Sequence, residues 1–219
     1  MAKQTIGALV FPGFELLDLY GPLEMFGFFT EHFEIQILSR TSDPVASRAG
    51  PRTLVDVAWG EGCSGGAAWS ELNPGGIAAP DLLLVPGGPG TRALVDEPVT
   101  LAWLADIAPK AGHTLSVCTG SALLARAGVL DGLHATTNKA AFAWVESQGP
   151  QVHWVRQARW VKDGSFYSSS GVSAGIDMAL AVIADLLGRA QAEQAALWAE
   201  YTWHDDPGRD PFAGRHGLI

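Results

Sequence analysis

Short apolar runs alternate along this chain with segments of helical periodicity. The runs Thr5–Phe11 and Asp81–Val85 are continuous and apolar, which is typical of strands buried on both faces, and Phe33–Ser39 alternates. Further strands are expected near 114–117, 135–137 and 152–157 and in a hairpin over 159–170, and helices near 15–25, 91–108, 120–128, 138–146, 175–187 and 190–201. This alternation predicts a doubly wound α/β fold, a mostly parallel sheet with helices on both faces.

The pattern weakens in a few places. Pro22 follows a glycine within the first helical segment, and a turn or kink is expected there because proline cannot donate a backbone hydrogen bond. Residues 60–79 are rich in Gly, Ala and Ser and predict an irregular surface excursion that holds Cys63. No repeat or low-complexity linker divides the chain. We therefore expect a single domain over residues 1–203 and an irregular C-terminal tail over 204–219.

Composition narrows the class of protein. With 47% hydrophobic and 17% charged residues the chain is globular, and a net charge of -9 without a basic stripe excludes nucleic acid as an expected partner. The apolar runs are far too short for a membrane span, and no leader peptide pattern opens the chain. The two cysteines, Cys63 and Cys118, cannot build a disulfide framework. A cytoplasmic location is expected.

One apolar run ends at a cysteine. Thr114–Val117 leads into Cys118, a small-residue turn follows, and a helical pattern begins, which predicts a strand, a sharp elbow and a helix. Unpaired N–H groups and the dipole at a helix N-terminus favour an anion, so the Cys118 thiolate should be stabilised. We predict that Cys118 is a nucleophile. Nothing near Cys63 builds such an environment, and we interpret it as a bystander.

Other groups follow strand ends, where ligands bind in such sheets. The glycines after Val85 do not match a dinucleotide or Walker loop, but their N–H groups can approach a ligand. The N–H groups of Gly88 and Thr119 are candidates for an anion pocket. Val172 is a candidate lining residue, with ordinary helix packing as the alternative. Asp18 lies among leucines, either as a cap or exposed acid or as a functional group.

The six histidines show no ligand spacing, so neither a metal site nor a cofactor is expected. His134, which precedes a strand, is a second possible partner for Cys118, ranked below Asp18 because no motif places it near the elbow.

Several ordered motifs resemble one family. They are Phe11–Pro22 (FPGFELLDLYGP), Pro86-Gly87-Gly88, Ser116–Gly120 (SVCTG), Ala135-Thr136-Thr137 and Gly171–Asp177 (GVSAGID). Together they resemble the DJ-1/PfpI superfamily, within the class I glutamine amidotransferase-like group, which implies a flavodoxin-like fold with a nucleophile elbow. The resemblance spans residues 4 to about 203 and implies a homodimer.

The subgroup is indicated by the residue after the cysteine. Members with protease-like or deglycase-like assignments often have histidine there, whereas this chain has Thr119. The Asp-Leu-x-Gly-Pro and Cys-Thr-Gly motifs resemble the isocyanide hydratase branch, which implies Cys118 as nucleophile and Asp18 as its acid/base partner. The sequence departs from this branch at Asn138-Lys139, where a histidine and an aromatic residue are common, and in the long 60–79 segment.

The resemblance implies hydration of a small isocyanide to an N-substituted formamide. Attack by Cys118 on the isocyanide carbon would give a thioimidate, and water would then release the product. A carboxyl group that alternates between acid and base, as proposed for Asp18, serves both steps. The alternatives are a glyoxalase or deglycase, a redox sensor that oxidises at Cys118, and a non-enzymatic ligand-binding regulator.

Overall fold

The computed structural model describes residues 2–60 and 78–219, and its main sheet confirms the predicted fold class. Within the described residues the sheet has seven strands in the order β10-β11-β7-β6-β1-β2-β5, parallel except for the β10–β11 hairpin. The strands are β1 (Gln4–Leu9), β2 (Phe33–Ser39), β5 (Val57–Ala58), β6 (Leu82–Val85), β7 (His113–Val117), β10 (Trp160–Asp163) and β11 (Phe166–Ser169). Cys63 and most of the 60–79 segment lie outside the described residues.

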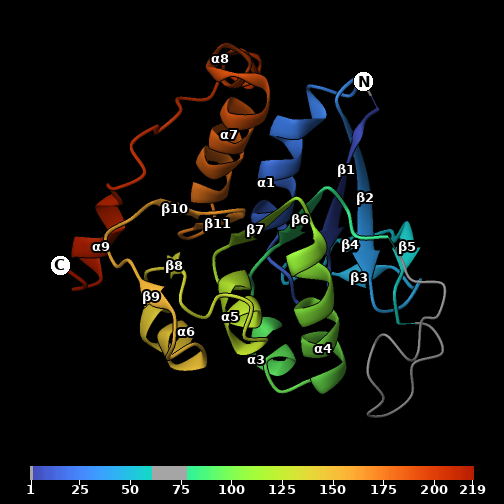
Figure 1. Cartoon of the computed structure of the whole chain (residues 1–219), viewed down its shortest axis with the longest axis vertical. Helices are drawn as coiled ribbons and strands as arrows, with labels where there is room; N and C mark the ends of the chain where they lie inside the picture. Colours follow the sequence, from blue (N-terminus) through green and yellow to red (C-terminus); the bar gives the residue numbers. More distant parts are fainter. Residues whose placement is uncertain (1, 61–77) are drawn as a thin grey trace.

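Helices cover both faces of this sheet (Figure 1). One layer holds α1 (Leu16–Gly27), α7 (Ala174–Leu187) and α8 (Arg189–Trp198). The opposite layer holds α3 (Thr91–Leu94), α4 (Pro98–Ile107), the short 3₁₀ helix η1 (Ala108–Lys110), α5 (Gly120–Arg126) and α6 (Phe142–Gln148). The central strands are buried on both sides, and every residue of β6 is inaccessible, as its apolar run predicts.

Two small sheets flank the main one. β3 (Val45–Ala46) pairs antiparallel with β4 (Arg52–Thr53), and β8 (His134–Ala135) pairs in parallel with β9 (His153–Trp154). None of the described helices combines the length and apolarity needed to cross a membrane.

The turn expected at Pro22 is not found, because α1 continues through this residue. Tertiary packing holds the helix at this point. A Cβ atom on Gly21 would lie 2.9 Å from Ile176 Cγ1, and one on Gly175 would lie 3.2 Å from Pro22 Cγ. The small residues therefore let α1 and α7 approach closely, and the burial of Pro22 between them compensates for its missing backbone donor.

The long helix expected over 91–108 is two helices, because Pro98 starts a new one as its first residue. The irregular tail expected over 204–219 contains α9 (Pro211–Arg215). Asp210 caps this helix: its side chain accepts a hydrogen bond of 2.9 Å from the Phe212 N–H, and Pro211 occupies the first turn. The Asp-Pro pair is thus a helix start, and the expectation of an irregular tail is wrong at these residues.

Candidate active site

Cys118 lies directly after β7 at the predicted elbow, with φ of 56°. Residues other than glycine rarely adopt this left-handed conformation, so the surrounding structure must hold it in place. The Cys118 N–H donates to the carbonyls of Ser169 (3.2 Å) and Ser170 (3.0 Å). Its carbonyl accepts hydrogen bonds from Ser121 Oγ (3.0 Å) and Thr137 Oγ1 (2.9 Å). The backbone of the cysteine is therefore fixed from both sides.

Asp18 of α1 is brought to this elbow by the fold, and it is fully buried. Its Oδ2 accepts a hydrogen bond of 2.9 Å from the Gly87 N–H, and its Oδ1 has no hydrogen-bond partner among the described residues. A Cβ atom on Gly87 would lie 2.8 Å from Asp18 Oδ2 and 2.5 Å from the Thr119 nitrogen. Only glycine allows this loop, the acid and the elbow to meet.

Burial gives Asp18 an unusual proton affinity. It raises the pKa of the carboxyl group from 3.8 to about 7, because a charge in this site loses its water. The hydrogen bond from the Gly87 N–H is the largest opposing influence on this pKa, the charge of Glu15 adds to the rise, and the Cys118 thiol lowers it. Asp18 can therefore both take up and release a proton near neutral pH.

Burial also raises the pKa of the Cys118 thiol to about 12, and the charge of Asp18 adds to the shift. The backbone N–H groups of Thr119 and Val172 and the side-chain amide of Asn138 interact with the sulfur and lower the pKa, but by less. The stabilised thiolate predicted from the elbow is thus wrong for the resting protein. These donors are placed to stabilise a thiolate once Asp18 has accepted the thiol proton.

Gly88 and Thr119 are brought together, but the Gly88 N–H is already paired. It donates to Thr119 Oγ1 at 3.0 Å, and Thr91 Oγ1 donates to the same oxygen at 3.1 Å. Gly88 has φ of 125°, and a Cβ atom there would lie 2.5 Å from the Gly13 carbonyl oxygen, which explains the glycine. The Gly88 N–H, which the sequence suggested as a hydrogen-bond donor to a bound anion, therefore points to a protein oxygen. The Thr119 N–H points to the Cys118 sulfur.

Asn138 is the site residue that the sequence interpretation missed. Its Oδ1 accepts a hydrogen bond of 3.0 Å from the Ala141 N–H, as expected of a cap, while its amide nitrogen packs against Gly171 and interacts with Cys118. A Cβ atom on Gly171 would lie 2.5 Å from that nitrogen. The sequence feature that could have identified Asn138 is its position directly after Thr136 and Thr137, because Thr137 donates a hydrogen bond to the Cys118 carbonyl.

A pocket of about 190 Å³ opens onto the sulfur. Its walls include Cys118, Thr119, Asn138 and Val172, and its outer rim carries charged side chains: Glu15, Arg48 and Arg92. A larger cavity of about 490 Å³ contains neither Cys118 nor Asp18.

The structure places His134 beside Asp163, with Nδ1 3.0 Å from Oδ2, and not in the wall of the Cys118 pocket. It therefore gives no support to a Cys-His pair. Within residues 2–60 and 78–219, no group of His, Cys, Asp and Glu side chains is arranged to hold a metal ion.

The fold and the elbow define a class: flavodoxin-like α/β proteins with a cysteine at a strained strand-to-helix turn. The DJ-1/PfpI family matches residues 4–185, and the chain belongs to this family. Isonitrile hydratase from Pseudomonas putida is 31% identical over 201 residues, which cover 92% of this chain and 79% of that protein. A helix-turn-helix transcriptional regulator from Pseudomonas aeruginosa is 29% identical over 89% of this chain but only 53% of the regulator.

Solved structures agree with this assignment. A ThiJ/PfpI family protein from Pseudomonas syringae has a TM-score of 0.79 and 31% identity, with 100% of this chain and 86% of that chain covered. A DJ-1 superfamily protein from Salmonella typhimurium shares the fold with a TM-score of 0.74 at 24% identity, over 91% of this chain and 100% of that one. The family resemblance drawn from the motifs is confirmed.

Proposed function

We propose that this protein is a cysteine-dependent hydratase that converts isocyanides into N-substituted formamides. The observation that carries the proposal is the buried Cys118–Asp18 pair, in which the acid has a pKa of about 7; no histidine or lysine of the part of the chain that the structure describes contributes to either pKa. The similarity to an isonitrile hydratase over 92% of the chain supports the choice of substrate class. The proposal includes a cytoplasmic homodimer that binds a small molecule and no nucleic acid.

The reaction would begin with addition of the Cys118 S–H to the isocyanide carbon. Asp18 takes the thiol proton, the Sγ–C bond forms, and the proton is returned to the same carbon, which gives R–N=CH–S. The Thr119 and Val172 N–H groups and the Asn138 amide stabilise the transient thiolate. Asp18 Oδ1, which lacks a protein partner among the described residues, is the oxygen available for this transfer.

Hydrolysis would then use the same acid. Asp18 removes a proton from water as the water oxygen bonds to the thioimidate carbon, and it delivers that proton to the nitrogen. The C–S bond breaks as the carbonyl forms, the hydroxyl proton of the adduct passes to the Cys118 sulfur, and R–NH–CHO leaves. The sum is isocyanide plus water, with no change in oxidation state and no other reactant.

The alternatives fit the site less well. Redox-sensor cysteines are exposed and have a low pKa, whereas Cys118 is only 7% exposed and its pKa is raised. A glyoxalase or deglycase of the type with histidine after the cysteine lacks that group here, because Thr119 holds the position. A ligand-binding regulator needs no acid with a pKa of about 7 beside its cysteine.

The direct test is incubation of the purified protein with phenyl isocyanide and detection of N-phenylformamide by mass spectrometry. The Cys118→Ala protein serves as the control for uncatalysed hydration. Formation of the formamide by the native protein alone supports the proposal. A native protein that leaves the isocyanide unchanged but consumes methylglyoxal would replace the hydratase with the carbonyl-directed alternative.

A further inference from the structure

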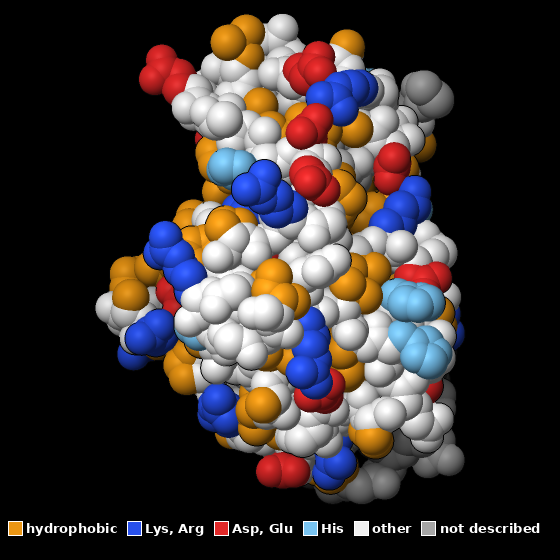
Figure 2. All heavy atoms as spheres, turned by 90° about the vertical axis from the view of Figure 1, so that its left-hand side faces the viewer, with side chains coloured by type: hydrophobic (Ala, Val, Ile, Leu, Met, Phe, Trp, Pro, Cys, Tyr) orange, Lys and Arg blue, Asp and Glu red, His pale blue; other side chains and the backbone are white. Residues whose placement is uncertain are grey.

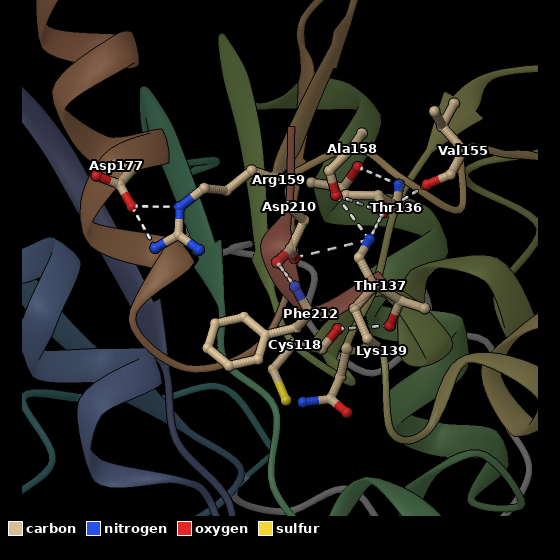
Figure 3. A network of polar contacts seen from close by, with 12 residues as sticks. Cys118, Thr136, Thr137, Lys139, Val155, Ala158, Arg159, Asp177, Asp210 and Phe212 are labelled. Carbon is tan, nitrogen blue, oxygen red and sulfur yellow. Dashed lines mark hydrogen bonds and ion pairs between the residues drawn. The ribbon is translucent and has the colours of Figure 1, made fainter. Parts of the chain in front are cut away.

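The C-terminal segment 204–219 is tied to the body of the protein by buried groups. The side chains of Lys139 and Asp210 are 2% and 0% exposed, and Lys139 Nζ lies 4.0 Å from Asp210 Oδ2 (Figure 3). The ammonium also donates to Thr136 Oγ1 (2.7 Å) and the Ala158 carbonyl (2.6 Å). The Asp210 N–H donates to the Gln157 carbonyl at 2.8 Å. Since a buried ion pair tolerates little displacement, the start of α9 is fixed in place.

A second anchor holds the segment further upstream. Asp177 of α7 accepts a hydrogen bond of 2.9 Å from the His204 N–H, and the Arg159 N–H donates to the Pro207 carbonyl at 2.7 Å. On the face that carries this segment, Lys and Arg side chains are interspersed with acidic and apolar ones and form no stripe of one charge (Figure 2).

The Lys139–Asp210 ion pair is connected to the active site through neighbouring residues. Lys139 binds Asp210, and its neighbour Asn138 directs an amide at the Cys118 sulfur. Phe212 of α9 and His216, which directly follows α9, line a pocket of about 220 Å³ together with residues 138–140 and 170–173. We call it the α9 pocket. Asn138 and Val172 line both this pocket and the one that contains Cys118, so the two are adjacent.

The α9 pocket differs in character from the outer rim of the Cys118 pocket. The rim carries Glu15, Arg48 and Arg92, which suit water and charged groups. The exposed surface of the α9 pocket is mainly apolar and includes Phe212, Val172 and Ala140, and the pocket is also lined by five polar residues: Asn138, Lys139, Ser170, Ser173 and His216. A cavity of about 150 Å³ is enough to hold benzene, so this pocket can accept a phenyl ring or a branched alkyl group.

We propose that the α9 pocket binds the uncharged aryl or branched-alkyl substituent of the molecule attacked by Cys118, and that Phe212 determines the preference for that substituent. The substrate class rests on the proposed hydratase function, whereas the pocket itself does not. An aromatic substituent gains an edge or stacked contact with Phe212, and water reaches the reacting carbon from the charged rim.

The first readout is selectivity: the ratio of kcat/KM for phenyl isocyanide to that for methyl isocyanide. Phe212→Ala lowers this ratio about fivefold to tenfold, the size of one lost aromatic pair. Ala140→Phe, which replaces a small lining residue with a ring that fills the pocket, lowers it about tenfold or more. Leu197→Ala removes an exposed leucine on α8 that is 69% accessible, and it leaves the ratio as in the native protein.

The second readout needs no turnover. 2-Bromo-N-phenylacetamide and 2-bromoacetamide both alkylate a thiol, with an S–C bond formed and bromide released, and they differ by the phenyl group. The rate at Cys118 is followed by mass spectrometry of its peptide, which separates it from Cys63. The phenyl reagent reacts faster with native protein, and Phe212→Ala and Ala140→Phe reduce that advantage.

The two readouts separate the two proposals. A native protein that fails to hydrate isocyanides but shows the variant-dependent alkylation ratio retains the α9 pocket and loses the hydratase function. Ratios in Phe212→Ala and Ala140→Phe that match Leu197→Ala overturn the pocket, whether or not isocyanide is hydrated. Circular dichroism confirms that each variant is folded before it is compared.

Discussion

Two fully buried aspartates, Asp18 and Asp177, have opposite surroundings. The Asp177 carboxylate binds the Arg159 guanidinium at 2.6 Å and 2.7 Å and accepts hydrogen bonds from Tyr201 Oη (3.0 Å) and the His204 N–H (2.9 Å). Among residues 2–60 and 78–219, Asp18 has one regular hydrogen bond, from the Gly87 N–H, and no Lys, Arg or His side chain contributes to its pKa. Asp177 therefore stabilises the fold, whereas Asp18 is suited to exchange a proton near neutral pH.

The different surroundings of the two aspartates distinguish a residue that stabilises the fold from one that can take part in a reaction. A buried carboxylate whose oxygens are paired with a guanidinium and other donors anchors its neighbours. A buried acid with one carboxyl oxygen that accepts no hydrogen bond has a raised pKa. It lowers the stability of the fold when it is ionised, and it can exchange protons with a reactant. The structure thus favours Asp18 as a functional group, and the comparison predicts opposite effects for the same substitution at the two positions.

The largest effect is expected for Cys118→Ala, which removes the proposed nucleophile. Hydration of phenyl isocyanide should fall by about ten-thousandfold or more, since loss of a nucleophile typically leaves only the residual catalysis of the binding site. The rate of N-phenylformamide formation measures this. A variant that keeps a tenth of the native rate would show that the reaction does not pass through a Cys118 adduct.

Asp18→Asn keeps the shape of the acid and an oxygen for the Gly87 N–H but removes the exchangeable proton. We expect kcat/KM to fall about a hundredfold to ten-thousandfold, the usual range for a general acid–base. In the native protein kcat/KM should rise with pH through about 7, because the ionised form of Asp18 accepts the thiol proton. The variant should lack this step. A profile with the same inflection in Asp18→Asn would assign the titration to another group.

The free energy of unfolding should change in opposite directions in Asp18→Asn and Asp177→Asn. Asp177→Asn leaves Arg159 buried beside a neutral partner and should lower the free energy of unfolding by about 3–5 kcal/mol. Asp18 binds its proton more tightly in the folded state than in the unfolded one, so native stability is lost as pH rises from about 4 to about 7. The shift from 3.8 to about 7 corresponds to about 4 kcal/mol.

Urea unfolding at pH 8 and pH 4 tests this opposition. Asp18→Asn should be more stable than native protein at pH 8 and close to it at pH 4, while Asp177→Asn should be less stable at both. The comparison fails if Asp18→Asn is destabilised at pH 8, because ionised Asp18 would then be a stabilising group.

The sequence was sufficient for the features that local patterns determine. The buried runs predicted the strands, the apolar run ending at Cys118 predicted the elbow, and the motifs paired Cys118 with Asp18 as candidates. It was misleading where tertiary contacts decide. Pro22 remains within α1 because α7 packs against it, and Asp210, which caps α9 locally, is buried beside Lys139 from far along the chain.

The protonation state of the site was also beyond the sequence. The elbow suggested a stabilised thiolate, but that inference considered the helix N-terminus without the burial and the charge of Asp18 that raise the pKa of Cys118. In the same way the Gly88 N–H looked free until the fold placed Thr119 Oγ1 opposite it. Both errors come from groups that meet only in the folded chain.

The smallest effect is expected at Asn138, which supplies a donor to the sulfur and also caps the turn before α6. Asn138→Ala removes both roles, and Asn138→Asp keeps the cap acceptor but replaces the donor with a negative charge. Loss of one hydrogen bond to a thiolate should lower kcat/KM about tenfold in Asn138→Ala.

The matched variant separates the roles. Asn138→Asp should lose more activity than Asn138→Ala, since the new charge raises the pKa of Cys118 further, while its thermal stability stays nearer to the native value. If activity instead follows stability across the pair, with the aspartate variant the more active, Asn138 acts only as a cap. The donors around the sulfur would then reduce to the Thr119 and Val172 N–H groups.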